Sequence, residues 1–364
     1  MFKIPIYQPS LVGNEKKYVN DCLDSNWISS KGKYVSLFEK EFSRYVNVNY
    51  ATGVCNGTVA LHLALLALGI SQGDEVIVPT LTYIASVNSI SYTGATPIFV
   101  DSLPDTWQID PEEVRKSITP KTKAIMAVHL YGHPCEMSAL KEIANEYRIF
   151  LIEDCAEAIG SKYQGIHVGT FGDVATFSFY GNKTITTGEG GMVVTNDQTI
   201  FERVVHFKGQ GLAKYREYWH DVIGYNYRMT NICAAIGLAQ LERVNEILTK
   251  KRQVAELYKE LLKETDYKVH PEVGNVLHSY WMISILVDKA IRRDHVRDHL
   301  EKVGIETRPV FYPVHTMPMY SLKFQKHKFA EDIGWRGINL PSYPDLSKED
   351  IEFICQTLKI AEIY

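Results

Sequence analysis

Hydrophobic positions along the first half of the chain alternate between short β-type runs and helical stretches. We expect strands at Ala51–Cys55, Glu75–Val78, Thr96–Val100, Ala124–Val128 and Ile149–Ile152. We expect helices between them at Val59–Leu68, 83–92, Pro111–Ile118 and Ser138–Tyr147. Repeated strand–helix–strand units predict an α/β fold, with a mostly parallel central sheet covered by helices on both faces.

The pattern changes in the second half of the chain. A helical pattern runs from Asn231 to about Lys263, which is long enough that we expect it to bend or break and to bridge two domains. After it come a predicted strand at Trp281–Val287, a helix at Arg292–Val303 and a final helix. We therefore expect a large domain over residues 1–240 and a smaller C-terminal α+β domain over residues 241–364.

Composition narrows the classes of function. The net charge is −4 without a long run of one sign, so nucleic acid and anionic membranes are not expected partners. We expect no transmembrane helix and no signal peptide. The six cysteines are scattered without a C-x-x-C pair, which favours reduced thiols in the cytoplasm and gives no reason to expect a metal site.

Three short motifs follow predicted strands, at the edge where parallel sheets bind ligands. The motif Asn56–Thr58 opens a helix whose free N–H groups suit a phosphate, although the motif alone favours a plain helix cap. The motif Thr82–Tyr83 offers a ring that either lies on a planar cofactor or packs in the core. The motif Glu153–Ala158 ends an apolar strand with carboxylates, which is costly unless they are used.

One lysine, Lys183, stands in an apolar, glycine-rich stretch that we expect to form a sharp loop between strands Val174–Phe179 and Met192–Thr195. Partial burial lowers the pKa of a lysine, and the neutral amine attacks aldehydes. Asp154, 29 residues earlier, could keep a pyridine nitrogen protonated. Together they suit pyridoxal phosphate, although a lone loop lysine is usually a surface residue.

A polar loop near the N-terminus carries a tryptophan between two predicted helices, Glu15–Leu23 and Val35–Tyr45. Within it, Trp27 and Ser29 are candidates for substrate contacts, because loops often carry function. Local packing of the tryptophan between the helices explains the same residues equally well.

Taken in order, six motifs resemble those of the nucleotide-sugar aminotransferases, a family of pyridoxal phosphate enzymes with the type I fold. They are Cys55–Ala64, Glu153–Gly160, Ser178–Lys183, Thr187–Gly191, Gly224–Thr230 and Leu340–Pro344. Each motif is weak alone, but their order and spacing over essentially the whole chain are specific. The resemblance is strongest to members that aminate C4 of GDP-4-keto-6-deoxymannose.

The resemblance implies roles for the matching residues. Lys183 matches the lysine that binds the cofactor and moves a proton, and Asp154 matches the partner of the pyridine nitrogen. The other implied cofactor contacts are Asn56, Gly57, Thr58, Tyr83, Glu157, Ser178 and Asn226. The implied substrate contacts are Arg228, Tyr312 and His315. In the family the counterpart of Asn226 comes from another subunit, which implies a homo-oligomer, dimer or tetramer, with composite active sites.

Glu157 departs from the pattern of many members, which have Gln near the phenolic oxygen of the cofactor. Two anionic oxygens would repel there, so either a proton is shared or Glu157 points elsewhere.

The implied reaction moves the amino group of L-glutamate to a nucleotide-linked keto-deoxyhexose. A UDP- or dTDP-linked 4-keto or 3-keto sugar, a dehydratase and a non-catalytic sugar-nucleotide-binding protein are the alternatives. The lysine at 183 argues against dehydratases, in which histidine replaces it.

Overall fold

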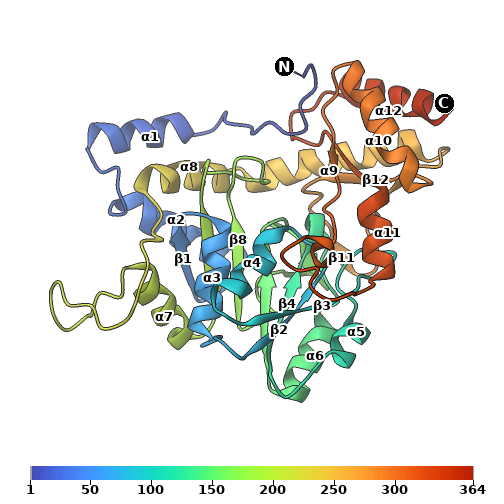
Figure 1. Cartoon of the computed structure of the whole chain (residues 1–364). Helices are drawn as coiled ribbons and strands as arrows, with labels where there is room; N and C mark the ends of the chain where they lie inside the picture. Colours follow the sequence, from blue (N-terminus) through green and yellow to red (C-terminus); the bar gives the residue numbers. More distant parts are fainter. Residues whose placement is uncertain (1, 364) are drawn as a thin grey trace.

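The computed structural model describes residues 2–363, which form a large α/β unit and a smaller C-terminal α+β unit (Figure 1). The large unit is built on a seven-stranded sheet with the order β1-β9-β8-β5-β4-β2-β3. Its strands are β1 (Tyr50–Val54), β2 (Glu75–Pro79), β3 (Thr96–Val100), β4 (Thr122–Val128), β5 (Phe150–Asp154), β8 (Val174–Ser178) and β9 (Gly191–Thr195). The five strands from β8 to β3 are parallel and β9 is antiparallel to both neighbours, which confirms the predicted mostly parallel sheet.

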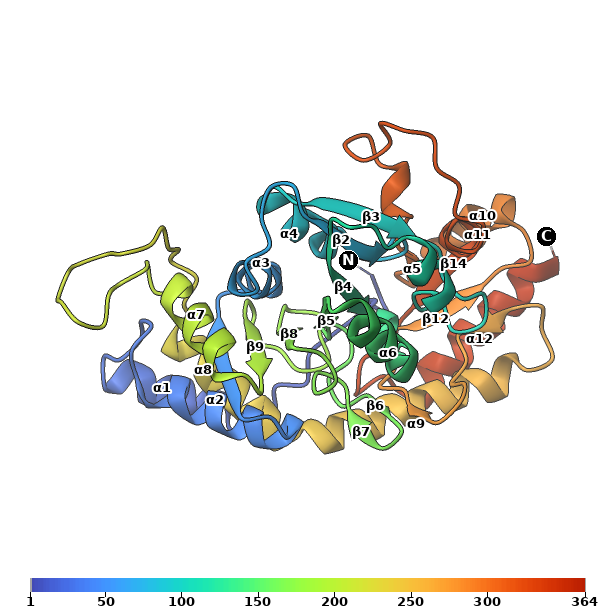
Figure 2. The ribbon, with the colours of Figure 1, turned by 90° about the horizontal axis from the view of Figure 1, so that it is seen from below.

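Helices cover both faces of this sheet, as Figure 2 shows along its edge. Side chains of β4 explain why, because Ala124, Met126 and Val128 enter one apolar cluster while Ile125 and Ala127 enter another. The first face packs against α3 (Gly57–Ala67), α4 (Ile84–Tyr92) and α7 (Gln198–Lys208). The second face packs against α2 (Lys33–Val46), α5 (Pro111–Lys116), α6 (Met137–Tyr147) and α8 (Asn231–Glu242).

The smaller unit surrounds a second, four-stranded sheet with the order β10-β12-β14-β13. Its strands are β10 (Lys268–Val269), β12 (Ile283–Leu286), β13 (Arg308–Pro309) and β14 (Gly337–Leu340), and its helices are α10 (Ala290–Lys302), α11 (Lys328–Arg336) and α12 (Lys348–Ile363). The remaining elements are α1 (Glu15–Asp24), the single-turn helices η1 (Leu130–Gly132) and η2 (Val314–Thr316), and a small sheet of β6 (Lys162–Tyr163), β7 (Ile166–His167) and β11 (Val276–Leu277).

Helix α9 (Val244–Leu262) joins the two units. The long helical pattern breaks at Arg243, between α8 and α9, as expected. Residues early in α9 pack in the large unit, and residues from Val254 onward pack in the small one. The boundary at residues 240/241 stays a prediction, because α9 belongs to both cores.

Helix α11 and strand β14 of the small unit were missed from the sequence, as were the two-residue strands β10 and β13. Helix α11 begins after a lysine-rich stretch, and β14 is a four-residue strand that stops at Pro341. Both are too short for hydrophobic periodicity to identify them. Among the described residues, no helix combines the length and the apolar character needed to cross a bilayer.

Candidate active site

Lys183 lies on the loop between the antiparallel strands β8 and β9, as predicted. The loop is held by its own backbone, since the N–H of Lys183 donates to the carbonyl of Tyr180 and that of Thr187 donates to Phe179. The lysine side chain is only 12% exposed, with Nζ 3.6 Å from Oε1 of Glu157. Burial lowers the pKa of Lys183, and Glu157 opposes this shift.

Asp154 is buried at the carboxyl end of β5. Its Oδ2 accepts a hydrogen bond of 2.8 Å from Ser86 Oγ, and its Oδ1 accepts one of 3.1 Å from the N–H of Ala156. Burial raises the pKa of Asp154, and these two hydrogen bonds and Lys183 oppose that rise. The site therefore offers a buried carboxylate whose charge a cationic ligand group would stabilise.

Glu157 faces Lys183 from the turn after β5. Its Oε2 accepts a 2.7 Å hydrogen bond from the N–H of Tyr131. Burial raises the pKa of Glu157 to about 7, while the nearby Lys183 lowers it. Because burial raises the pKa of Glu157 and lowers that of Lys183, it favours the neutral form of both groups.

Aromatic rings connect Tyr83 to Lys183 through successive contacts. The ring of Tyr83, which is 54% exposed, lies 5.4 Å from that of Phe311. Phe311 stacks on Tyr131, and Tyr131 stacks on Trp281. The ring centroid of Trp281 is 3.7 Å from Nζ of Lys183. These rings form an apolar wall beside the ionisable groups. Helix α4 begins directly after Tyr83 and carries Ser86, the hydrogen-bond donor to Asp154.

The start of helix α3 forms a cradle at the end of β1. Asn56 caps this helix by accepting from the N–H of Val59, so its side-chain oxygen serves the helix. The N–H groups of Gly57 and Thr58 have no hydrogen-bond partner within the described part of the chain. A Cβ on Gly57 would lie 2.7 Å from Cβ of Ser178, so only glycine lets these backbones approach so closely.

The segment holding Asn226 and Arg228 runs beside this cradle within the same chain. Arg228 forms an isolated β-bridge with Val54, and the N–H of Cys55 donates to Tyr227. The exposed Arg228 guanidinium donates two hydrogen bonds to Oδ1 of Asn226. A contact donated by another subunit stays a prediction.

The loop with Trp27 and Ser29 is tied to the start of α8. The backbone carbonyls of both residues accept hydrogen bonds from Asn231, and the Trp27 side chain is 55% exposed. Trp27 and Asn231 line a groove of about 390 Å³ together with Asp21, Ser25, Gly32 and Lys33. The loop thus lies near the segment of Asn226, and its contact with substrate stays a prediction.

Tyr312 and His315 lie in the small unit, and their polar side-chain atoms already contact other side chains. Tyr312 accepts a hydrogen bond from Arg293 and packs on Trp335. His315 is buried, with Nδ1 2.7 Å from Thr80 Oγ1 and Nε2 3.3 Å from Glu331. Their predicted contact with the sugar stays a prediction.

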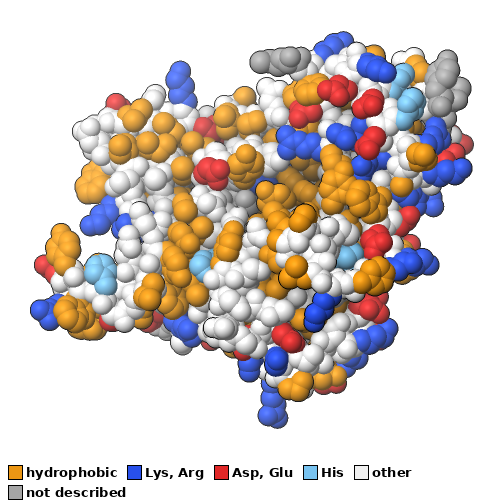
Figure 3. All heavy atoms as spheres, in the orientation of Figure 1, with side chains coloured by type: hydrophobic (Ala, Val, Ile, Leu, Met, Phe, Trp, Pro, Cys, Tyr) orange, Lys and Arg blue, Asp and Glu red, His pale blue; other side chains and the backbone are white. Residues whose placement is uncertain are grey.

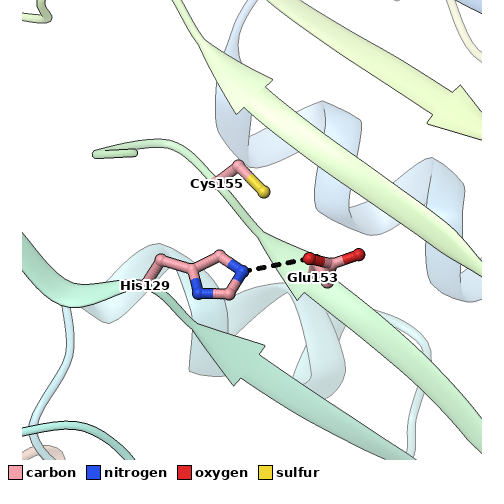
Figure 4. A group of neighbouring side chains, drawn as sticks. All are labelled: His129, Glu153 and Cys155. Carbon is pink, nitrogen blue, oxygen red and sulfur yellow. Dashed lines mark hydrogen bonds and ion pairs between the residues drawn. The ribbon is translucent and has the colours of Figure 1, made fainter. Parts of the chain in front are cut away.

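His129, Glu153 and Cys155 form a buried cluster with the spacing of metal ligands (Figure 4). The ligand atoms of His129 and Glu153 already have protein partners. Nδ1 of His129 accepts from the N–H of Cys135, so Nε2 carries the proton and donates to Glu153 over 3.1 Å. Glu153 also accepts three backbone N–H groups from the turn at 169–172. Glu153 therefore fixes that turn, and His129 and Glu153 are not free to bind a metal.

Four residues that touch the site were missed from the sequence: Tyr7, Ser86, Tyr131 and Trp281. Tyr131 lies in the single-turn helix η1, which was not predicted, and Trp281 was predicted to begin a strand. Each reaches the site through the tertiary fold, which hydrophobic periodicity does not describe. For Tyr7, the neighbouring Pro5 and Pro9 give only a weak sequence signal for a place in the site.

Comparison with known proteins defines the family. A family described as the DegT/DnrJ/EryC1/StrS aminotransferases matches residues 9–359. The chain belongs to this family. It is 66% identical to GDP-perosamine synthase of Escherichia coli O157:H7, and the match covers 98% of this chain and 97% of that protein. It is 52% identical to GDP-perosamine synthase of Vibrio cholerae, and this match covers 98% of each chain. The solved PLP form of Spr1654 from Streptococcus pneumoniae superposes with a TM-score of 0.94 at 28% identity, covering 99% of this chain and 98% of that one.

This DegT/DnrJ/EryC1/StrS aminotransferase is an enzyme that uses pyridoxal phosphate. The site fits that cofactor. The cradle at Gly57 has free N–H groups for a phosphate, and the buried carboxylate of Asp154 suits a protonated pyridine. Near Asp154 and Glu157 lies a buried lysine, Lys183, whose lowered pKa favours the nucleophilic amine.

Proposed function

We propose that this aminotransferase moves the amino group of L-glutamate to C4 of GDP-4-keto-6-deoxy-D-mannose, forming GDP-perosamine. The observation that carries the proposal is 66% identity, over nearly the full length of both chains, to a GDP-perosamine synthase. The site supports the reaction class, because it keeps the lysine at 183 beside the carboxylates of Asp154 and Glu157.

The residues then take these roles. Lys183 would hold the cofactor through Nζ, and its free amine would move the proton at the substrate carbon. Asp154 keeps the pyridine nitrogen protonated, with Ser86 holding the carboxylate. When bound, the cofactor withdraws electrons from the carbon that loses and regains a proton.

The phosphate is held by the free backbone N–H groups of Gly57 and Thr58, together with the hydroxyl of Ser178. Tyr83 covers one face of the ring. Glu157 forms an ion-pair contact with Lys183, with 3.6 Å between Oε1 and Nζ. Asn226, donated by a second copy of the chain, completes the phosphate site. Trp27, Ser29, Arg228, Tyr312 and His315 are the candidates for substrate contacts.

Transfer of labelled nitrogen tests the proposal. Holoenzyme is mixed with ¹⁵N-glutamate and a panel of GDP-, UDP- and dTDP-linked 4-keto and 3-keto sugars, with Lys183→Ala as the inactive control. We expect ¹⁵N on GDP-4-keto-6-deoxymannose, with one 2-oxoglutarate formed per amine transferred. Preference for another sugar would overturn the acceptor, and loss of a sugar hydroxyl without amine transfer would indicate a dehydratase.

A further inference from the structure

The apolar stripe of helix α9 contains one buried lysine. Val244 and Ile247 pack in the large unit, and Val254 and Tyr258 pack in the small one. Lys251 lies between them on the same helical face and is only 1% exposed. Burying an amine is unfavourable unless its hydrogen bonds are used, so packing alone does not account for this lysine.

The amine of Lys251 contacts three segments that are distant in sequence. It donates to the carbonyl of Trp281 over 3.1 Å and to the carbonyl of Ser342. It also lies 5.3 Å from the ring centroid of Tyr7. Among the described residues, no carboxylate forms an ion pair with it. Its contribution is therefore to hold these segments together and not to balance a charge.

Two of the three segments continue directly to Lys183. The hydroxyl of Tyr7 donates a 2.6 Å hydrogen bond to the carbonyl of Lys183. The indole N–H of Trp281 donates a 2.7 Å hydrogen bond to the carbonyl of Asn182, and the ring lies over Nζ of Lys183. Lys251 is thus connected to the peptide and to the amine of Lys183 by two separate paths, each through one aromatic residue.

We propose that Lys251 is a positioning residue for Lys183. It holds the backbone of Trp281 and the ring of Tyr7 so that both aromatic residues fix the Lys183 loop. Through α9, the junction of the two units thereby sets the orientation of the reactive amine. The proposal rests on the proposed function only in that Lys183 is the reacting group, and it does not depend on the identity of the sugar.

The test compares Lys251→Met, Tyr7→Phe and the double variant with the wild type. Tyr258→Phe is the matched control, because its hydroxyl donates a 3.0 Å hydrogen bond from the same helix to Pro341, next to Ser342. Holoenzymes are compared by kcat and KM. Cofactor-free full-length protein is labelled with acetic anhydride at a series of pH values, and the acetylation of Lys183 is followed by peptide mass spectrometry.

We expect Lys251→Met and Tyr7→Phe each to lower kcat about 10-fold or more with little change in KM, since small misplacements of a reacting group slow chemistry. The midpoint of Lys183 labelling should rise towards that of an ordinary lysine, because a released side chain gains water. The double variant should lose less than the product of the two single effects. Tyr258→Phe should change neither kcat nor the midpoint.

Unchanged kcat and labelling in Lys251→Met would overturn the proposal, as would equal losses in Tyr258→Phe. If Lys251→Met does not fold, Lys251→Gln is used in its place. An unchanged pH midpoint of Lys183 labelling in that variant would likewise overturn the proposal. The labelling needs neither glutamate nor sugar. A wrong acceptor sugar would therefore leave it unchanged, and the two proposals fail by different measurements.

Discussion

The charged groups around Lys183 are all buried, and the protein compensates each one locally. Hydrogen bonds from Ser86 and the N–H of Ala156 favour the charged form of Asp154, while burial raises its pKa. Glu157 and Lys183 compensate each other, and burial moves both towards neutrality. Such opposed pKa shifts within one site are typical of groups that exchange protons.

Asp154→Asn tests the role of the negative charge. Asparagine occupies the same space but cannot keep a pyridine nitrogen protonated, so we expect the variant to retain pyridoxal phosphate and to lose about two orders of magnitude in kcat. Cofactor content is read from absorbance after dialysis, and kcat from the steady-state rate with glutamate. A nearly normal rate would show that Asp154 serves the fold alone.

At this scale, the sequence was informative where chemistry and local pattern coincide. Lys183 and Asp154 were predicted because each stands in a recognisable motif beside a strand. Tyr7 and Trp281 were not, because their contacts with the lysine loop join residues 176 and 99 positions apart in the chain. Contacts so distant in sequence depend on how the two units pack, and a single sequence does not encode that in a local pattern.

At the scale of elements, a chain of neutral histidines links the segment between β3 and α5 to the segment before β12. The N–H of Tyr280 donates to Nδ1 of His278, so Nε2 of His278 carries the proton and donates to His270. His270 in turn donates to the carbonyl of Thr106. Burial lowers the pKa of both histidines, to about 3 for His270. Protonation of either ring would put a donor where this chain needs an acceptor.

This arrangement predicts that the two histidines make the protein less stable as the pH falls from 7 to 5. An unfolded histidine binds a proton below pH 6.5, while these folded ones do not, so stability falls as pH drops through that value. The loss is about 2 kcal/mol per histidine between pH 6.5 and 5. Urea unfolding at pH 7 and pH 5 measures it.

His270→Gln should show a smaller loss between these pH values, while His295→Gln, on the exposed face of α10, should behave as the wild type. An identical pH dependence in all three proteins would assign the effect to other groups.

At the scale of the whole molecule, an arm of the chain between α7 and α8 projects away from the body (Figure 1). Large apolar side chains are exposed on it, namely Tyr215, Tyr218, Trp219 and Ile223. Orange side chains gather at the corresponding left edge of Figure 3. Exposed apolar groups on a projecting segment are typical of an interface, and this arm ends at Asn226. We infer that it packs on a second copy of the chain.

Subunit mixing tests the composite site. Lys183→Ala and Asn226→Asp homo-oligomers should each be inactive, because one lacks the reacting amine and the other places a carboxylate against the phosphate. After exchange, one site in each mixed pair has a native lysine and a native partner segment, so we expect up to about a quarter of wild-type activity at equal mixing. Verified exchange without recovery would place Asn226 in the site of its own chain.

Helix α9 has a consequence for how the molecule comes apart. Its buried face is shared, since Val244 and Ile247 pack in one core and Val254 and Tyr258 pack in the other. Neither core can melt without exposing half of that face, so we expect the two units to lose structure cooperatively, as a single calorimetric transition at one subunit concentration. In hydrogen exchange, the amides of α9 should be protected as long as those of the central strands. Two resolved transitions, or early exchange along α9, would mean that the units are thermodynamically separate.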